Sequence, residues 1–164
     1  MTHRRIEVNP DQIKVINNLQ PPRNPKEVQK LTRIMAALNR FISRSTDRCR
    51  PFFLLLHKWK EFEWSKECVV AFQQLKQYLS RLPIMSSPMV DEVLFAYIAV
   101  AFYVISFMLI RVDSGIQRPV NYVSKLLNEA EVRYLPLEKA ILAVVHATRN
   151  LPHYFQAHTA VVLT

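Results

Sequence analysis

Glycine is almost absent from this sequence of 164 residues, in which it occurs once, at Gly115. An average composition of roughly 7% would supply about eleven glycines. Sites that cradle phosphates in a glycine-rich loop need several glycines at fixed spacing. The sequence therefore excludes nucleotide binding of the P-loop or dinucleotide type.

Cysteine is also scarce, and Cys49 and Cys68 form neither a zinc-ligand spacing nor a disulfide framework. We expect two packed thiols in a reducing compartment. His146, His153 and His158 are too scattered along the chain for a zinc site. The first ten residues, MTHRRIEVNP, hold no apolar segment typical of a secretory signal, so an intracellular location, cytoplasmic or nuclear, is expected.

Charge is unevenly distributed between the two halves of the chain. Residues 1–88 hold 16 Lys and Arg against 7 Asp and Glu, a net charge of +9, whereas residues 89–164 hold six of each. A basic half joined to a neutral half indicates two modules, of which the first faces a polyanion. A merely soluble basic surface would give the same composition.

The basic half contains three helix starts. Asn9 precedes Pro10, Asn24 precedes Pro25, and Ser65 precedes an apolar pattern, so each is placed as an N-cap. Apolar residues recur at intervals of three and four after the second start, which predicts one buried stripe on that helix. This stripe consists of Val28, Leu31, Met35, Leu38 and Ile42. Between the last two starts, Phe62 and Trp64 are expected to anchor the helices.

In the neutral half, the apolar residues no longer follow the helical spacing of three and four. Residues 93–110 are rich in β-branched and aromatic residues, which predicts strands, and a turn centred on residues 113–115 leads into a returning strand. A helix over 135–151 and a final strand at 158–164 follow. This order of strands and helix predicts a mixed sheet with a packed helix, in a domain that is incomplete at the end of this sequence. The same 18 uncharged residues meet the length of a membrane span, although their composition favours strands.

Three stretches carry a resemblance to a known family. They are NPKEVQKLTRIMAALNRFI, FEWSKECVVAFQQLKQYL and RPVNYVSKLLNEAEVRYLPLEKAILAVVHATRNLPHYF. The first two resemble the segment after the polymerase palm in Pol polyproteins of gypsy-class LTR retrotransposons, closest to plant elements. The third resembles the RNase H-like domain of the same polyproteins.

The resemblance implies an α+β fold. Residues 1–88 would form a helical thumb- or connection-like module of reverse transcriptase, and residues 89–164 a truncated RNase H-like domain, incomplete at its C-terminus. In the family, the helical segment rests on the template–primer duplex, mostly through phosphates. The residues expected to bind nucleic acid are Lys26, Lys30, Arg33 and Arg40, although a solvated charged face explains each of them equally well.

The polymerase motif of the family, Y-x-D-D, has no match in this chain. The nuclease of the family uses two divalent metals, normally Mg²⁺, held by converging carboxylates. Matched to its motifs T-D-A-S and T-E-K-E-L-L-A, the first two ligand positions fall on Ala99 and Ala140, and the third falls after Thr164. We therefore expect no metal, no cofactor and no catalysis.

Glu138 is the one carboxylate left in the matched helix motif. Two helical positions are about 200° apart, so Glu138 points away from the direction of Ala140. In the first turn of a helix, a carboxylate is favoured by exposed backbone N–H groups, which predicts a capping role.

Two functions follow as hypotheses. The first is an inactive fragment of a reverse transcriptase/RNase H polyprotein that positions nucleic acid, whose partners would be RNA–DNA or DNA duplexes, bound weakly and without sequence preference, and other Pol segments. The alternative is a protein-interaction or membrane-associated module with no nucleic-acid role.

Overall fold

The computed structural model describes residues 5–6, 8–58, 60–82 and 84–163. Four helices come first, between two short antiparallel strands, β1 (Arg5–Ile6) and β2 (Met85–Ser86). These helices are α1 (Pro10–Asn18), α2 (Pro25–Ala37), α3 (Ser45–His57) and α4 (Lys66–Leu79), with a 3₁₀ turn, η1 (Asn39–Phe41), after α2.

The three predicted helix starts are confirmed, each with its side-chain cap. Asn9 Oδ1 accepts a hydrogen bond from the Asp11 N–H at 3.0 Å, and Asn24 Oδ1 accepts one from the Glu27 N–H at 3.0 Å. Ser65 Oγ accepts a bond from the backbone N–H three residues ahead. Because proline needs no hydrogen bond at the first helical position, Asn-Pro fixes the start of α1 and of α2.

The predicted stripe is buried, and it forms the core of the helical part together with side chains of α3 and α4. Phe62 and Trp64 pack against this core, and the Trp64 ring stacks on Phe52 with 5.7 Å between ring centroids. The anchoring role predicted for this segment is confirmed. Burial raises the pKa of the Cys49 thiol to about 12, so this thiol stays protonated inside the core.

Helix α3 was missed: the sequence pattern predicts three helices in the first half, and the structure has four among its described residues. Its N-cap is Arg44, in the left-handed conformation and without a side-chain cap bond, and Pro51 lies inside the helix. Both features are typical of chain breaks. The helix is stabilised instead by burial of Cys49, Phe52 and Leu55 against the other helices.

The second half forms a four-stranded sheet in the order β5-β4-β3-β6. Its strands are β3 (Leu94–Val100), β4 (Val104–Asp113), β5 (Ile116–Leu126) and β6 (Ala160–Leu163). The first three are antiparallel neighbours, and β6 runs parallel to β3. The apolar run at 93–110 is therefore two strands, and across the parts of the chain that the structure describes no helix has the length and apolarity to cross a membrane.

The β4–β5 hairpin uses the single glycine of the chain. Ser114 and Gly115 have φ angles of 51° and 78°. Two successive positive φ angles match the right-handed twist of the flanking strands, and glycine adopts such an angle without strain. The predicted turn at 113–115 is confirmed.

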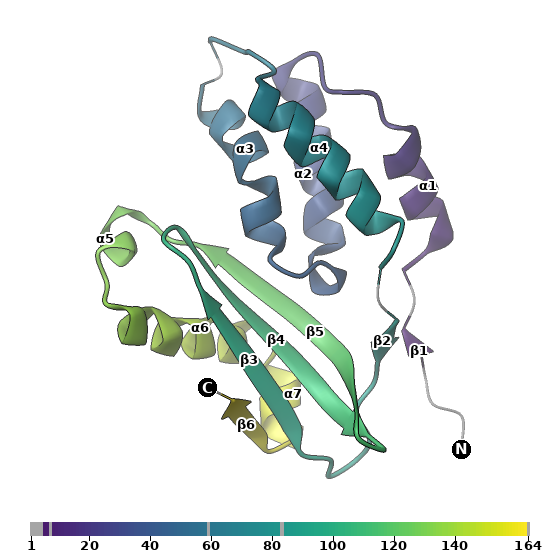
Figure 1. Cartoon of the computed structure of the whole chain (residues 1–164), viewed down its shortest axis with the longest axis vertical. Coiled ribbons are helices and arrows are strands. Elements are labelled where there is room, and N and C mark those ends of the chain that lie inside the picture. The colour runs from purple at the N-terminus through teal and green to yellow at the C-terminus, as the bar shows by residue number, and fades with distance from the viewer. Residues whose placement is uncertain (1–4, 7, 59, 83, 164) are drawn as a thin grey trace.

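Helices α5 (Glu129–Val132), α6 (Pro136–Asn150) and α7 (Pro152–Ala157) lie between β5 and β6 in sequence. Helix α6 packs across one face of the sheet, and α7 continues from it (Figure 1). Ala147 of α6 joins a core with Leu94, Ala96 and Phe107. The α1–α4 group lies on the other side of the sheet, against β5 (Figure 1).

Strand β5 joins the two parts of the molecule. Tyr122 is buried in the core of the helices, and burial, with the nearby Tyr78, raises its pKa to about 12. Ser124 Oγ lies 2.8 Å from Ser45 Oγ and 2.7 Å from Thr46 Oγ1, and it accepts a hydrogen bond from the Thr46 N–H. The start of α3 is thus fixed to β5, an edge strand of the sheet.

Truncation of Phe52 tests this helical core. Phe52 is 0% exposed and Leu54, on the same helix, is 46% exposed. We expect Phe52→Ala to lower the free energy of unfolding by about 3–5 kcal/mol, because it leaves a cavity beside Trp64. Leu54→Ala is the matched control and should change it by about 0.5 kcal/mol or less. Equal effects of the two variants in urea denaturation would contradict the core assignment.

Candidate nucleic-acid interface

Three of the predicted nucleic-acid-binding residues lie on one face of α2. Lys26, Lys30 and Arg33 are spaced by four and three residues, and all three are exposed. At 100° per residue, the centre of this line lies about 180° from the buried line of Val28 and Met35. Within the described part of the chain, none of the three forms an ion pair with Asp or Glu. The structure therefore brings these three charges together on the solvent side.

Arg40 stands apart from this face. It lies in η1 and is half-buried, with its guanidinium carbon 5.3 Å from the centre of the Phe41 ring. Its Nε is buried and has no hydrogen-bond partner among the residues that the structure describes. Sequence spacing could not show this, because α2 ends at Ala37 and the helical period no longer applies at residue 40.

A second group of basic residues was missed together with α3. Arg44, Arg48 and Lys66 line a groove of about 600 Å³ between α3 and α4, which Asp47 and Glu67 also line. Arg44 is paired with Asp47 at 2.5 Å. Arg48 donates from Nε to the Ser43 carbonyl and stacks over the Tyr78 ring. The carboxylates of Asp47 and Glu67 offset part of the positive charge in the groove.

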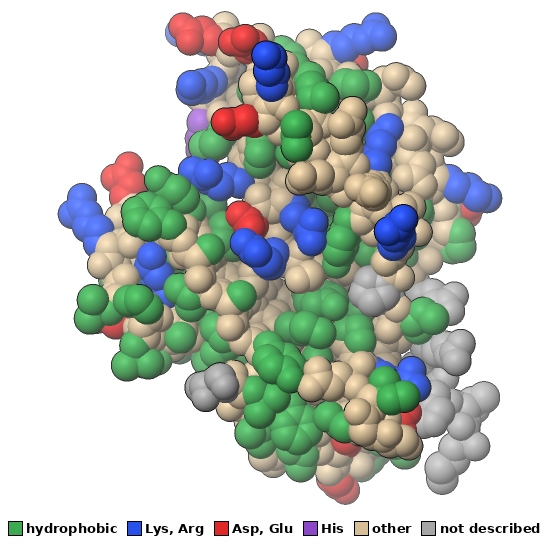
Figure 2. All heavy atoms as spheres, in the orientation of Figure 1, with side chains coloured by type: hydrophobic (Ala, Val, Ile, Leu, Met, Phe, Trp, Pro, Cys, Tyr) green, Lys and Arg blue, Asp and Glu red, His purple; other side chains and the backbone are tan. Residues whose placement is uncertain are grey.

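Positive side chains are spread over the helical part of the molecule (Figure 2). The surface over the lower part of the sheet in the same view is dominated by hydrophobic side chains. The uneven charge predicted from the sequence thus corresponds to a basic helical surface on this face of the molecule. A surface of this kind attracts phosphates without reading bases.

The positions matched to metal ligands carry no oxygen atoms in their side chains. Ala99 lies in β3 opposite Ser106, and Ser106 lies opposite Ser124, so this row faces α3. Ala140 lies on α6, which packs against the other face of the sheet. The third matched position falls after Thr164, outside the described residues.

Mg²⁺ needs several oxygen ligands at one point. Among the residues described, no three His, Cys, Asp or Glu side chains gather in a way that could hold a metal ion. Side chains at the two matched positions thus do not fit the metal pair that the resemblance implies. The absence of a bound metal and of catalysis stays a prediction.

Glu138 has the capping role that was predicted. Its Oε2 accepts a hydrogen bond from the Leu135 N–H at 2.8 Å, three residues before it, and its side chain is exposed. Its neighbour Lys139 is buried instead, and donates from Nζ to the Phe102 carbonyl at 3.0 Å. This bond ties α6 to the turn after β3.

The described histidines add no metal site, and His146 adds no cation at neutral pH. Burial, followed by the positive charge of Lys125, lowers the pKa of His146 below its usual value.

Glu131 accepts bonds from Lys125 and from the Asn128 N–H. Burial acts to raise the pKa of Glu131, but these bonds and the nearby charges outweigh it and lower the pKa.

Sequence comparison gives matches over most of the chain. The chain is 27% identical over 150 residues to a retrovirus-related Pol polyprotein from transposon 297 of Drosophila melanogaster, covering 91% of this chain and 14% of the relative. It is 23% identical over 141 residues to the transposon Tf2-3 polyprotein of Schizosaccharomyces pombe, a match that covers 83% of this chain and 10% of the relative. The chain thus spans a small part of the length of these curated relatives.

Solved structures give the same fold. The foamy viral protease-reverse transcriptase in complex with dsDNA matches 95% of this chain and 33% of its own, with a TM-score of 0.81 at 16% identity. In the same enzyme in complex with an RNA/DNA hybrid, the match covers 94% of this chain and 21% of the enzyme chain, with a TM-score of 0.79 at 16% identity.

The family profile of RNase H-like domains found in reverse transcriptase matches residues 64–162, which is more than half of the chain. This range includes α4, strands β3, β4 and β5, the helix with Ala140 and all of β6 except its last residue. The α+β fold with its mixed sheet agrees with this match and with the structural neighbours. The chain belongs to the family of RNase H-like domains found in reverse transcriptase.

Proposed function

We propose that this chain binds and positions a nucleic-acid duplex within a Pol polyprotein of a gypsy-class element of plant type, and that it does not cleave RNA. Residues 1–88 act as the thumb-like module and residues 89–164 as the RNase H-like module. The observation that carries the proposal is the row of cations on α2, Lys26, Lys30 and Arg33. They are exposed on the side opposite its buried face and form no ion pair with any residue that the structure describes. Structural neighbours that bind dsDNA and an RNA/DNA hybrid support it.

Binding of this kind is weak and independent of sequence, because contacts to phosphates carry no base information. Each cation that neutralises a phosphate releases condensed counterions, so affinity falls steeply with salt. Arg40 is proposed as a fourth contact, through the parts of its guanidinium other than the buried Nε. The remaining Pol segments would supply further contacts and the polymerase chemistry.

The origin in a gypsy-class element has its own test. We expect the genomic sequence upstream of this coding region to encode a palm with paired aspartates, and the sequence downstream to encode an integrase. Flanks that encode neither would contradict a retrotransposon origin.

The α2 cations can be tested by their effect on the salt dependence of binding. We expect Lys26→Gln, Lys30→Gln and Arg33→Gln together to reduce the slope of log affinity against log salt by up to about 2.7, since each lost phosphate contact is worth about 0.9. Adding Arg40→Gln should reduce it further. Fluorescence anisotropy with a DNA duplex and with an RNA–DNA hybrid measures the salt slopes of both variants.

A matched control removes the same charge elsewhere. Lys14, Arg133 and Arg149 are exposed and lie on other elements. Their combined change to glutamine should leave the slope nearly unchanged. Equal slopes for the α2 triple variant, the quadruple variant with Arg40→Gln and the unmodified protein would overturn the proposed interface.

A further prediction concerns catalysis. We expect no cleavage of the RNA strand of a hybrid with Mg²⁺ or Mn²⁺, because two divalent ions repel each other unless converging carboxylates offset their charge and dehydration. Ala99→Asp should rescue nothing, because one carboxylate cannot assemble the pair. Turnover that depends on metal and is abolished by Glu138→Gln would show that the site is active.

A protein-binding role is the second candidate, with one observation in its favour. Large apolar side chains at the start of α6 and at the preceding turn are exposed, led by Leu137 at 72% and Leu135 at 66%. Exposed apolar groups in one region are typical of partner contacts. Such binding would depend little on salt, which separates it from phosphate binding.

A further inference from the structure

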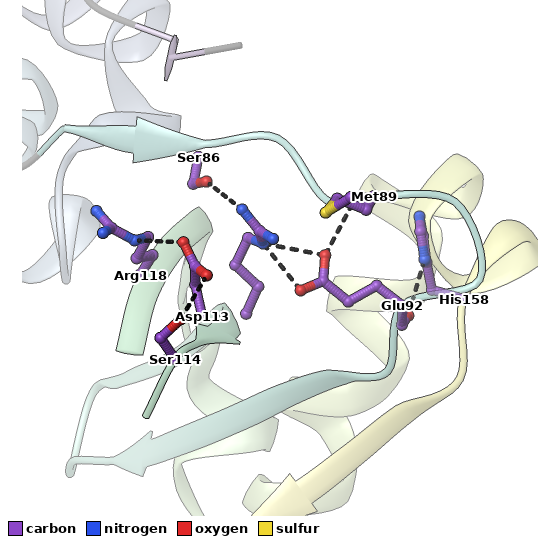
Figure 3. A network of polar contacts seen from close by, with 8 residues as sticks. Ser86, Met89, Glu92, Asp113, Ser114, Arg118 and His158 are labelled. Atoms are coloured by element: carbon purple, nitrogen blue, oxygen red, sulfur yellow. Dashed lines mark hydrogen bonds and ion pairs between the residues drawn. The ribbon is translucent and has the colours of Figure 1, made fainter. Parts of the chain in front are cut away.

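The joint between the helical part and the sheet holds a buried ion pair. Arg111 of β4 is 3% exposed, and its Nε donates to Glu92 Oε1 at 2.9 Å and to Oε2 at 3.0 Å (Figure 3). Glu92 is 17% exposed. Arg111 Nη1 also donates to Ser86 Oγ at 3.2 Å. One guanidinium therefore contacts two residues that are six positions apart.

These two residues are the ends of the segment that connects the helices to the sheet. Ser86 lies in β2, next to Met85, which is buried in the core of the helices. Glu92 lies two residues before β3, the first strand of the main sheet. Arg111 therefore holds together the last strand of the helical part and the entrance to the sheet. We call Ser86, Glu92 and Arg111 the linker clamp.

The segment between the ends of the clamp is folded into a closed turn. Glu92 Oε2 accepts a bond from the Met89 N–H at 2.8 Å, and the Glu92 N–H donates to the Met89 carbonyl at 3.3 Å. Asp91 inside this turn has a φ of 59°, which is unfavourable for a residue with a side chain. A strained residue persists only where surrounding contacts determine its conformation. The bonds of Glu92 supply these contacts.

The clamp also reaches the far edge of the sheet. His158, two residues before β6, places Nδ1 2.9 Å from the Glu92 carbonyl (Figure 3). A carbonyl only accepts hydrogen bonds, so Nδ1 carries the proton. Glu92 therefore contacts β4 through its carboxylate and the segment before β6 through its backbone.

A second attachment is what fixes an orientation. The hydroxyl contacts of Ser124, together with Tyr122 buried in the core of the helices, attach the helical part near one end of β5. Attachment near one end of an interface resists rotation less than attachment at both ends. Arg111 lies opposite Arg118 on β5, six residues from Ser124, which is roughly 20 Å along a strand. Two attachments at this separation leave little freedom for rotation.

We propose that the linker clamp locks the orientation of the helical part on the RNase H-like sheet. Without it, the helices and the sheet stay folded but sample a wider range of relative orientations about the contacts of Tyr122 and Ser124. The consequence for duplex binding rests on the proposed function, because a duplex that contacts both parts needs them in one arrangement.

Distances between spin labels test the lock directly in the full chain without nucleic acid. Ala37→Cys at the end of α2 and Gln156→Cys on α7 place labels on exposed positions of the two parts. Cys49 and Cys68 are both buried, so they should not react with the label. We expect one narrow distance distribution in the unmodified background, and a broadened or shifted one after Arg111→Met or Glu92→Gln.

The matched control is Asp113→Asn, which removes the exposed ion pair to Arg118 on the same hairpin. Its distribution should equal that of the unmodified background. An unchanged distribution in a folded Arg111→Met variant would overturn the proposal. If Arg111→Met does not fold, Ser86→Ala decides: broadening supports the clamp, and an unchanged distribution overturns it.

The consequence for binding is measured separately. In a clamp variant, some fraction of the molecules keeps the original distance between the labels. The apparent affinity for a DNA duplex should be the affinity of the unmodified background multiplied by that fraction, with the salt slope unchanged. Absence of any duplex binding by the unmodified protein would overturn the proposed function, whereas the distance measurement would still decide the clamp.

Discussion

The packing of β5 against α3 is the contact on which the rest of the arrangement depends. Tyr122 and Ser124 alternate with residues that face the other way, so this strand contributes to the core of the helices and closes one edge of the sheet. The basic face of α2 lies on the side away from the residues that this helix buries in the same core.

Helices cover both faces of the sheet, but to different extents. Helix α6 covers one face and supplies Ala143 and Ala147 to the cores beneath it. The α1–α4 group covers the other face only near β5 and β4, through Tyr122 and Met108. Ala99 belongs to this second face and Ala140 to the helix on the first. The two positions that would anchor a nuclease site thus contribute small apolar side chains to two different layers.

The charges of the molecule divide into two kinds. The cations on α2 are exposed, and dissolved salt screens them from one another. Arg111 and Lys139 are buried, and each donates hydrogen bonds to partners inside the protein. Since a buried charge without a partner is strongly destabilising, these two cations serve the structure and not binding. A count of Lys and Arg cannot distinguish these kinds.

The sequence by itself determined the features whose causes are local. Asn-Pro pairs set the starts of α1 and α2, the apolar period set the buried face of α2, and Gly115 set the hairpin. Capping, periodicity and positive φ all involve residues close together in the sequence. Tertiary structure alone decided that 45–57 is helical, since its burial outweighs an internal proline. It also decided that Arg40 is half-buried and that Arg111 reaches Ser86, 25 positions away. Contacts between distant segments depend on how whole elements pack, and no local pattern records them.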